Sequence, residues 1–392
     1  MSAAEDAGLR ARDGHHAKVT NEELFFDLVY VFAITQLSHG LLHHLSALGA
    51  LQTLILWFAV WLGWQYTCWV TNWFDPERRP VRLMLFALML AALVMAAAIP
   101  EAFGARGMVF ALAYVSIQVG RTLFVLWRLR AEHPLVPNFR RMLGWLAIAA
   151  CFWIGGAFAE GGVRIALWIV AILCEYVSPM IGFALPGLGR SRSDSDWTIE
   201  GAHLTERCQL FVIVALGETI LTAGAPFSTT AAWTATSVLA LLAAFVGTLA
   251  MWWLYFGTSS RDATHVITGS DDPGRIGAQI HYAHVILIGG IIVTAVGNDL
   301  VLAHPDEVAS LGKALALAGG PAIYLLGSAL YKRVVYGRLP VSHLAGIAAL
   351  VPIAGLSLVT NLLVVGWLTT VLVLAVGFAE PAGRPAGRPH HG

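Results

Sequence analysis

Long apolar runs alternate with short polar segments along the whole chain. A helix that crosses a membrane needs about 20 mostly apolar residues, and twelve stretches of the sequence meet this requirement. They lie at residues 22–42, 49–72, 82–100, 107–127, 142–158, 164–185, 203–223, 230–257, 280–303, 314–331, 341–358 and 361–379. The pattern therefore predicts an all-α, polytopic integral membrane protein with about twelve transmembrane helices.

The longer polar segments divide the chain into two six-helix halves. We expect a cytoplasmic N-terminal tail at 1–20, a first half at 21–185, a cytoplasmic linker at 186–202, a second half at 203–379 and a disordered tail at 380–392. The last of these is a short Pro/Gly repeat, PAGRPAGRPHHG, which is typical of disorder. The first 18 residues lack the apolar run of a signal peptide, so the first span is expected to direct insertion. No separate domain is expected in the loop at 257–279.

Composition supports the membrane class. Hydrophobic residues make up 57% of the 392 residues and charged residues 12%, whereas a soluble domain has about 25% charged residues. Lys plus Arg equals Asp plus Glu at 24 each, so the charge balance indicates no nucleic-acid partner, and membrane lipids are the expected surroundings. The four cysteines lie in apolar segments without CxxC spacing, which predicts no disulfide framework.

The distribution of Lys and Arg predicts the orientation, because cytoplasmic loops carry an excess of both. With the N-terminus inside, nineteen of the 24 fall in cytoplasmic segments. Only Arg106, Arg164 and Lys313 fall in outer segments, and Arg121 and Arg207 lie inside spans. We therefore expect both termini in the cytoplasm.

Two long motifs, TNEELFFDLVYVFAITQLSHGL and HLTERCQLFVIVALGETIL, resemble the bacterial low temperature requirement protein A family, LtrA. The segments TNWFDPERRPVRLMLFALMLAALVMAAAIPEAFG, WWLYF and HYAHVILIGGIIVTAVGNDLVL are similar to it as well, so the resemblance covers nearly the whole chain. It implies a many-helix protein of the bacterial inner membrane. The family name describes a growth phenotype and implies no reaction.

A shorter resemblance concerns mechanism. FFDLVYVFAIT is similar to the first-helix motif of potassium- and proton-conducting channels with a Phe-Ser-Asp signature. Phe25, Phe26 and Asp27 lie on that motif, although Phe26 stands at its serine position and Asn21 at the position of its arginine. The similarity implies ion conduction, and a channel of this kind would need more than one chain, so homo-oligomerisation is left open.

The two halves show a weak internal similarity. Laying Phe211 on Phe25 places Arg207 on Asn21 and Ile220 on Ile34. This alignment suggests a parallel 6+6 repeat, an arrangement that places transport sites between halves. Accidental symmetry of a twelve-helix protein is the alternative.

Carboxylates inside the first span are the first candidate site. Glu23 and Asp27 lie about 40° apart on a helix, and Tyr30 is beside them. Two carboxylates one turn apart repel when both are ionised, so a cationic partner is expected, and Arg207 is the natural one. The functional interpretation is a proton- or cation-coordinating site, and the alternative is an interfacial cluster that fixes helix ends.

The span at 203–223 carries the second set. His203, Arg207 and Glu218 lie on one stripe of a helix, with Glu206 on another side. Glu218 lies deep in an apolar segment, where an unpaired carboxylate costs at least a few kcal/mol. It is therefore the strongest functional candidate in the sequence.

Further buried charges could pair with these groups. Arg121 lies mid-span and is expected to neutralise Glu218 or Glu175, and Asp299 lies near the outer end of its span. Pro179 follows Glu175 by four residues, so it frees the carbonyl of Glu175 from helical hydrogen bonding. Helix docking is the alternative role of these charges.

Histidine pairs raise the question of a metal. His39 and His43 are one turn apart, as are His281 and His284, but the topology places the pairs on opposite sides of the membrane. Neither pair has a local carboxylate at zinc-like spacing, so no metal and no cofactor is predicted. The sequence also lacks a phosphate-binding loop, a nucleophile elbow and an HExxH motif.

These observations favour a transporter or channel for protons, a monovalent cation or a small solute, rather than an enzyme. Its path would be lined by the spans at 22–42 and 203–223, through Glu23, Asp27, Tyr30, His203, Glu206, Arg207 and Glu218. One alternative is a membrane-embedded enzyme that acts on a lipid or isoprenoid, with Glu218 or Glu175 as general acid. Another is a structural or sensory protein that supports growth in the cold.

Overall fold

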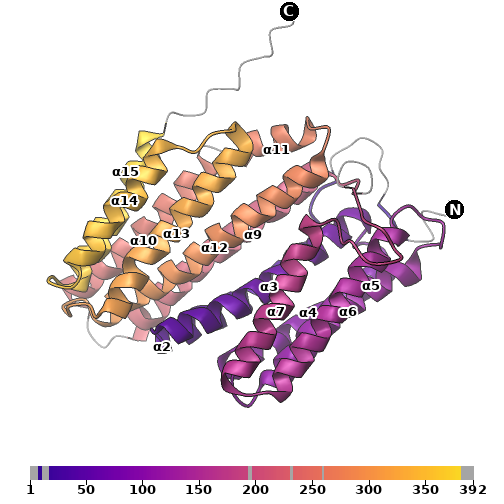
Figure 1. Ribbon diagram of the computed structural model, residues 1–392. Helices are drawn as coiled ribbons and strands as arrows, with labels where there is room; N and C mark the ends of the chain where they lie inside the picture. Colours follow the sequence, from indigo (N-terminus) through magenta and orange to yellow (C-terminus); the bar gives the residue numbers. More distant parts are fainter. Residues whose placement is uncertain (1–7, 11–16, 193–196, 230–232, 258–259, 381–392) are drawn as a thin grey trace, which may run out of the picture. The chain divides into compact units, whose positions relative to one another are not determined.

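The computed structural model describes residues 8–10, 17–192, 197–229, 233–257 and 260–380. These residues form α-helices and isolated β-bridges but no strands (Figure 1), which confirms the all-α prediction. The α-helices are α2 (Asn21–His43), α3 (Ala47–Trp73), α4 (Arg79–Ala98), α5 (Gly107–Arg128), α6 (Val136–Phe158), α7 (Gly161–Met180), α9 (Gly201–Thr229), α10 (Ala235–Phe256), α11 (Ser260–Thr268), α12 (Pro273–Ala303), α13 (Leu311–Tyr336), α14 (Val341–Leu356) and α15 (Leu362–Ala379). One short 3-10 helix, η1 (Ile99–Glu101), follows α4.

Eleven helices in the described part of the chain are long and apolar enough to cross a membrane. They correspond to eleven of the twelve expected spans, and the remaining one is α14, an apolar helix of 16 residues. The polytopic membrane architecture predicted from the apolar runs is therefore confirmed.

Some helix ends differ from the prediction for local reasons. α6 begins at Val136 rather than at 142, with Pro137 in its first turn, a position that suits proline because the first helical N–H groups have no intrahelical partner. α7 ends at Met180 rather than at 185, because Gly182 and Phe183 adopt positive φ angles of 64° and 49° that interrupt the helix. The loop at 257–279 contains the short helix α11, which the sequence did not indicate.

Polar side chains cap several helices. Thr234 and Ser237 form a reciprocal capping box at the start of α10. The side chain of Asn361 accepts a hydrogen bond from the N–H of Val364 (3.0 Å) at the start of α15. Gly337 ends α13 in the left-handed conformation, with φ 72°.

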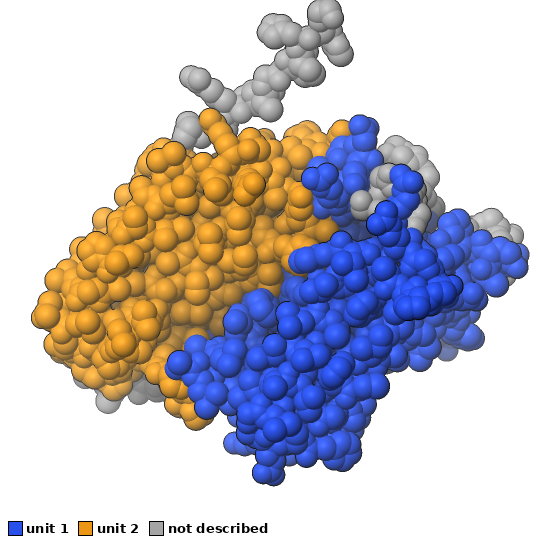
Figure 2. Space-filling model, in the orientation of Figure 1, with its two compact units in different colours: residues 1–40, 47–207, 270–277 blue, residues 41–46, 208–269, 278–392 orange. Residues whose placement is uncertain are grey.

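The chain forms two compact units, drawn in separate colours in Figure 2. Unit 1 comprises residues 1–40, 47–207 and 270–277, and unit 2 comprises residues 41–46, 208–269 and 278–392. Unit 1 holds α3 to α7, most of α2 and the first turns of α9. Unit 2 holds the rest of α9, α10, α11, most of α12 and α13 to α15.

The core of unit 1 is aromatic. The ring of Trp153 on α6 lies 4.9 Å from that of Tyr114 on α5 and 5.2 Å from that of Trp168 on α7, between centroids. Phe110 packs on Trp168 at 5.6 Å. Such offset contacts add about 0.5–1.5 kcal/mol per pair to the burial of the rings. This packing fixes the position of the Tyr114 ring.

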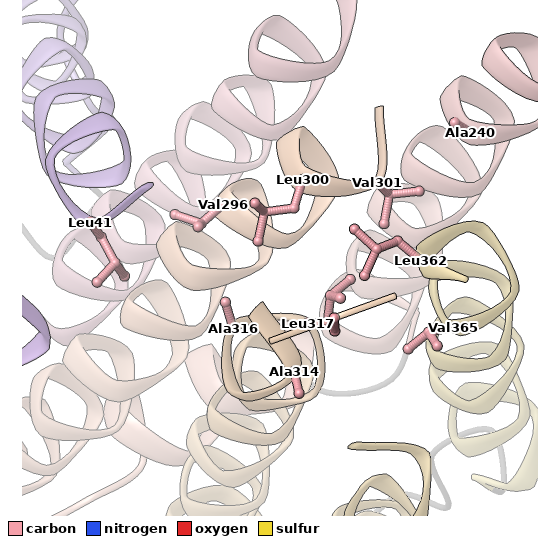
Figure 3. Packing of buried hydrophobic residues seen from close by; sticks show 11 residues of the cluster. Leu41, Ala240, Val296, Leu300, Val301, Ala314, Ala316, Leu317, Leu362 and Val365 are labelled. Atoms are coloured by element: carbon pink, nitrogen blue, oxygen red, sulfur yellow. The ribbon is translucent and has the colours of Figure 1, made fainter. Parts of the chain in front are cut away.

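The core of unit 2 is aliphatic. Figure 3 shows side chains from α10, α12, α13 and α15 gathered with Leu41, from the end of α2. Leu317 and Leu362 are 4% and 0% exposed at its centre. The cluster also contains the small residues Ala240, Ala314 and Ala316, which let the helices approach one another closely.

Glycines let α12 and α13 touch through their backbones. A Cβ atom added at Gly327 would collide with the backbone of Leu287, and one added at Gly290 with the backbone of Tyr324. A Cβ atom added at Gly320 would likewise collide with the backbone of Thr294. Because backbone cannot move aside as a side-chain tip does, these positions tolerate no side chain without separation of the helices.

We therefore expect Gly327→Ala to destabilise the protein by about 1–3 kcal/mol, the usual cost of overpacking. Gly319→Ala on the same helix is the matched control, because a Cβ there meets nothing within 4 Å. That variant should be neutral or slightly stabilising, since alanine favours helix over glycine. Thermal unfolding in detergent measures both, and equal melting temperatures for the two variants would contradict the close contact.

Candidate functional site

The centre of the candidate site is Arg207, in the second turn of α9. Its Nη1 donates to Oε1 of Glu23 at 2.9 Å, and its Nη2 donates to Oδ1 of Asp27 at 2.5 Å. All three side chains are fully buried within unit 1. The pairing expected from helical spacing is therefore confirmed. It arises because Glu23 and Asp27 are one turn apart on α2 and so face the same guanidinium.

Glu23 is held by four further groups. His203 Nε2 lies 3.0 Å from the carboxylate oxygen that binds Arg207. The other oxygen accepts from Arg10 at 3.0 Å and from the backbone N–H of Thr20 at 3.0 Å. The hydroxyl of Thr20 donates to it as well, at 3.2 Å. The cluster thus contains two carboxylates and two guanidinium groups, so its charges balance when His203 is neutral.

Asn72 on α3 sets the tautomer of His203. Its side-chain oxygen accepts from the backbone N–H of Glu200 (2.8 Å), and its amide nitrogen donates to the carbonyl of Glu200 (2.9 Å). The same amide nitrogen lies 3.2 Å from His203 Nδ1. The amide donor favours Nδ1 as acceptor and Nε2 as donor to Glu23 Oε1 at 3.0 Å, although Arg10 Nη2 also lies 3.3 Å from Nε2.

Asp27 is held asymmetrically. Its Oδ1 accepts from Trp64 Nε1 at 2.6 Å and from Arg207, whereas its Oδ2 has no hydrogen-bond partner. The hydroxyl of Tyr30, one turn further along α2, is fully buried and has no partner either. Buried polar atoms normally find partners, and water molecules commonly supply them, so these two atoms are available to bind water or an ion.

A surface pocket of about 390 Å³ adjoins the cluster. Its lining includes Arg10 and Thr20, both of which bind Glu23, together with Lys18, Asp75 and Glu77. The pocket therefore brings solvent to the groups that hold the first carboxylate.

A second polar network lies deeper in unit 1. Tyr114 donates to Oε2 of Glu175 at 2.5 Å, and Gln118 Nε2 donates to the Tyr114 oxygen at 2.9 Å. The guanidinium of Arg121 donates to Gln118 Oε1 at 2.5 Å and to the hydroxyl of Thr67 at 3.1 Å. Tyr114, Gln118 and Arg121 follow one another at helical spacing on α5, so they form one ridge of that helix.

Arg121 and Glu175, named from the sequence as possible charge partners, are connected indirectly within the described residues. Gln118 and Tyr114 stand between the two charges and connect them by hydrogen bonds. The pairing of Arg121 with Glu218 stays a prediction. The freed carbonyl before Pro179 is confirmed: the Glu175 carbonyl accepts from Tyr66 at 3.3 Å and from Ser178 at 3.2 Å.

The remaining predicted site residues lie elsewhere. Glu218 is 1% exposed, in the part of α9 that belongs to unit 2. Asp299 is half-buried on α12 in unit 2, and Glu206 is half-buried on α9. The path role of these residues, and of Glu23, Asp27, Tyr30, His203 and Arg207, stays a prediction.

Three cations assigned to loops by the sequence are buried in helices, which corrects that assignment. Arg164 on α7 is 6% exposed and donates to carbonyls at the ends of neighbouring helices, Gly104 among them (2.8 Å). Arg141 on α6 is 7% exposed and binds Asn138 and the carbonyl of Leu188. Lys332 on α13 is 2% exposed. The long side chains of Lys and Arg explain the error, because a position near a helix end does not determine where the charge lies.

Lys332 belongs to a buried cluster that the sequence analysis missed. It forms an ion pair with Glu380, and His343 Nδ1 lies 3.1 Å from the other oxygen of the same carboxylate. Ser328 Oγ lies 2.9 Å from His343 Nε2. Glu380, which the sequence placed in the C-terminal tail, is thus part of the folded unit 2. The rest of that tail, 381–392, lies outside the described residues.

The histidines of α12 have protein partners. His284 Nε2 lies 2.8 Å from the Tyr255 hydroxyl, and its Nδ1 lies 2.7 Å from the carbonyl of Ile280. His281 lies beside Cys208, at 3.8 Å. Within the ranges that the structure describes, no three His, Cys, Asp or Glu side chains are grouped as a metal site would require.

The long apolar helices and the charged clusters buried among them define a multi-pass α-helical membrane protein. The chain belongs to the bacterial low temperature requirement A protein (LtrA) family, whose sequence profile matches residues 18–378. An uncharacterized protein of Rhizobium meliloti (strain 1021) is 42% identical over 345 residues, which cover 87% of this chain and 84% of that protein. No solved structure matches the chain.

Proposed function

We propose that this protein is a transporter or channel of the bacterial inner membrane that moves protons, a monovalent cation or a small solute. The path would run along α2 and α9, past Glu23, Asp27 and Arg207. Both termini would lie in the cytoplasm, as the excess of Lys and Arg in the corresponding loops favours.

One observation carries the proposal: a fully buried set of ionisable side chains on helices that are apolar enough to span a membrane. Charges inside a membrane are expensive and commonly mark ion pathways and proton relays. Here Asp27 Oδ2 is buried without a partner, which leaves it open to a transported species.

The surface pocket beside Arg10 and Thr20 supports the same assignment, since it gives solvent access to the end of α2 that carries Glu23. Under the expected orientation this end is cytoplasmic. Glu218 would contribute through unit 2, as a buried carboxylate on the same helix as Arg207.

The proposal predicts that Asp27→Asn abolishes flux while the protein still folds. The substitution keeps the size of the side chain and removes its charge and one acceptor. Glu77→Gln is the matched control, since Glu77 is an exposed carboxylate at the pocket rim. Flux is measured in proteoliposomes with pH-sensitive and potassium-sensitive dyes under an imposed gradient. Normal flux through Asp27→Asn, in protein with native chromatographic behaviour, would contradict the path.

A further inference from the structure

Two polar networks of unit 1 approach each other at a single turn of α3. Trp64 on this turn donates to Asp27, the last residue of the first network. The carbonyl of Gly63, its neighbour, accepts from Arg121 Nη1 at 3.3 Å, and Arg121 is the first residue of the second network. Residues 63 and 64 therefore connect the two networks through consecutive positions of one helix.

Tyr30 lies at this junction. A Cβ atom at Gly63 would come within 2.9 Å of the Tyr30 hydroxyl, so that hydroxyl lies directly over the glycine. An alanine at this position would require the hydroxyl to shift. Tyr30 follows Asp27 by three residues on α2, so the two side chains lie on the same face of this helix. Tyr30 thus lies between the end of one network and the start of the other.

Three polar atoms at the junction are buried without hydrogen-bond partners: Asp27 Oδ2, Tyr30 Oη and Arg121 Nε. All three side chains are 0% exposed. One such atom would be an ordinary packing defect, but an acceptor, a hydroxyl and a donor in succession are the elements of an incomplete hydrogen-bond chain. Water molecules complete such chains in buried polar sites.

We propose that protons are the transported species and that they cross unit 1 through Asp27, Tyr30 and Glu175. This inference rests on the proposed transport function, specifies its substrate, and takes the inner part of the route past α3, α5 and α7 instead of along α9. A proton on Asp27 Oδ2 passes, through water where needed, to the oxygen of Tyr30, which releases its own hydroxyl proton on the far side. Tyr114 takes up that proton through water between the two phenols and passes its own to Glu175 Oε2, 2.5 Å away. Glu175 then releases a proton to water on the far side, which returns the chain to its starting state. Each phenol gains one proton and loses one, so no charge remains on it.

The chemistry of the route favours a proton over a metal cation. Potassium and sodium need several oxygen ligands converging on one point, and the guanidinium of Arg121 lies near Tyr30, Tyr114 and Glu175. A fixed positive charge repels a metal ion but leaves proton exchange along a hydrogen-bond chain possible, because each transfer displaces a charge over a short distance only.

Arg207 and Arg121 have distinct roles in this proposal. Arg207 neutralises Asp27 Oδ1 and Glu23, which leaves Asp27 Oδ2 as the exchangeable atom. Arg121 orients Gln118, which in turn donates to the Tyr114 oxygen. Tyr114 must therefore direct its own proton to Glu175, as the 2.5 Å contact between their oxygens indicates.

The test is proton flux in proteoliposomes through Tyr30→Phe. The substitution removes only a hydroxyl that has no partner, so the melting temperature should be unchanged while proton flux falls at least tenfold. Tyr324→Phe is the matched control, because its hydroxyl is buried too but donates to the carbonyl of Met251 in unit 2. That variant should melt earlier and conduct normally per folded molecule. Glu175→Gln is the second variant, and it should lose proton flux as well.

The outcomes separate this inference from the proposed function. Proton flux that Tyr30→Phe and Glu175→Gln both retain would overturn the route. Potassium flux without proton flux in the unmodified protein would overturn the assignment of the proton and leave transport intact. Flux of neither ion, nor of small solutes, would remove the proposed function and the inference together.

Discussion

Arg207→Met should destabilise the protein by about 3–5 kcal/mol, the usual cost of breaking a buried ion pair from one side. Methionine fills a similar volume, so packing is largely kept. However, Asp27 loses its only ionic partner, and Glu23 is left with Arg10 and His203. A carboxylate that stays buried without its cation must either remain charged in an apolar surrounding or take up a proton. Thermal unfolding in detergent, followed by tryptophan fluorescence, should show a large fall in melting temperature.

A triple variant tests whether the charge is the cause. Adding Glu23→Gln and Asp27→Asn to Arg207→Met removes the uncompensated carboxylates, so much of the lost stability should return. Arg338→Met is the matched control, since Arg338 is exposed on the segment after α13, and it should melt like the unmodified protein. An Arg207→Met variant as stable as Arg338→Met would show that the ion pairs are not needed to hold α2 and α9 together.

The geometry of this cluster could be predicted in part because it depends on helical periodicity. Glu23 and Asp27 share one face of α2, and His203 and Arg207 share one face of α9, since each pair is separated by four residues. The opposite charges on the two faces then indicate which helices pair. Local pattern and charge complementarity were sufficient for this step.

Arg10 and Asn72 could not be found in the same way. Arg10 lies in a polar N-terminal segment, and its contact with Glu23 requires that this segment fold back: the N–H of Arg10 donates to the carbonyl of Trp73 at 2.8 Å. Asn72 lies near the end of a Trp-rich helix, where the sequence predicts that a polar side chain faces the membrane–water interface. Neither role follows from a periodic pattern, because both depend on tertiary contacts between segments far apart in the sequence.

The boundary between the two compact units also depends on tertiary contacts. The sequence indicated a linker at 186–202 and a second half that starts at 203. The two compact units divide within α9, after Arg207, and the first turns of this helix bind α2 and α3 through His203 and Arg207. Whether the two halves are repeats of each other stays a prediction.

Lys332→Met is the second substitution for which we expect a large effect, a loss of about 3 kcal/mol, at the lower end for a broken buried pair. Lys332 and Glu380 have side chains that are only 3% and 8% exposed, so water compensates little of the lost interaction. The loss should be smaller than for Arg207→Met, because Glu380 keeps a second partner, His343 Nδ1 at 3.1 Å. The melting temperature in detergent measures the change.

The double variant Lys332→Met with Glu380→Gln separates charge from packing. If the unpaired carboxylate causes the loss, the double variant should melt above Lys332→Met, and Glu380→Gln alone should be destabilised through the buried ammonium left behind. Lys313→Met is the control, since Lys313 on the same helix binds the half-exposed Glu307 at 2.7 Å, and exposed pairs contribute about 0–1 kcal/mol.

Because α15 ends at Ala379, immediately before Glu380, loss of the pair between Lys332 and Glu380 should first release this end of α15 from α13. Protease sensitivity that rises at the C-terminal end of α15 before global unfolding would follow from this anchoring. Equal sensitivity of Lys332→Met and Lys313→Met would contradict it.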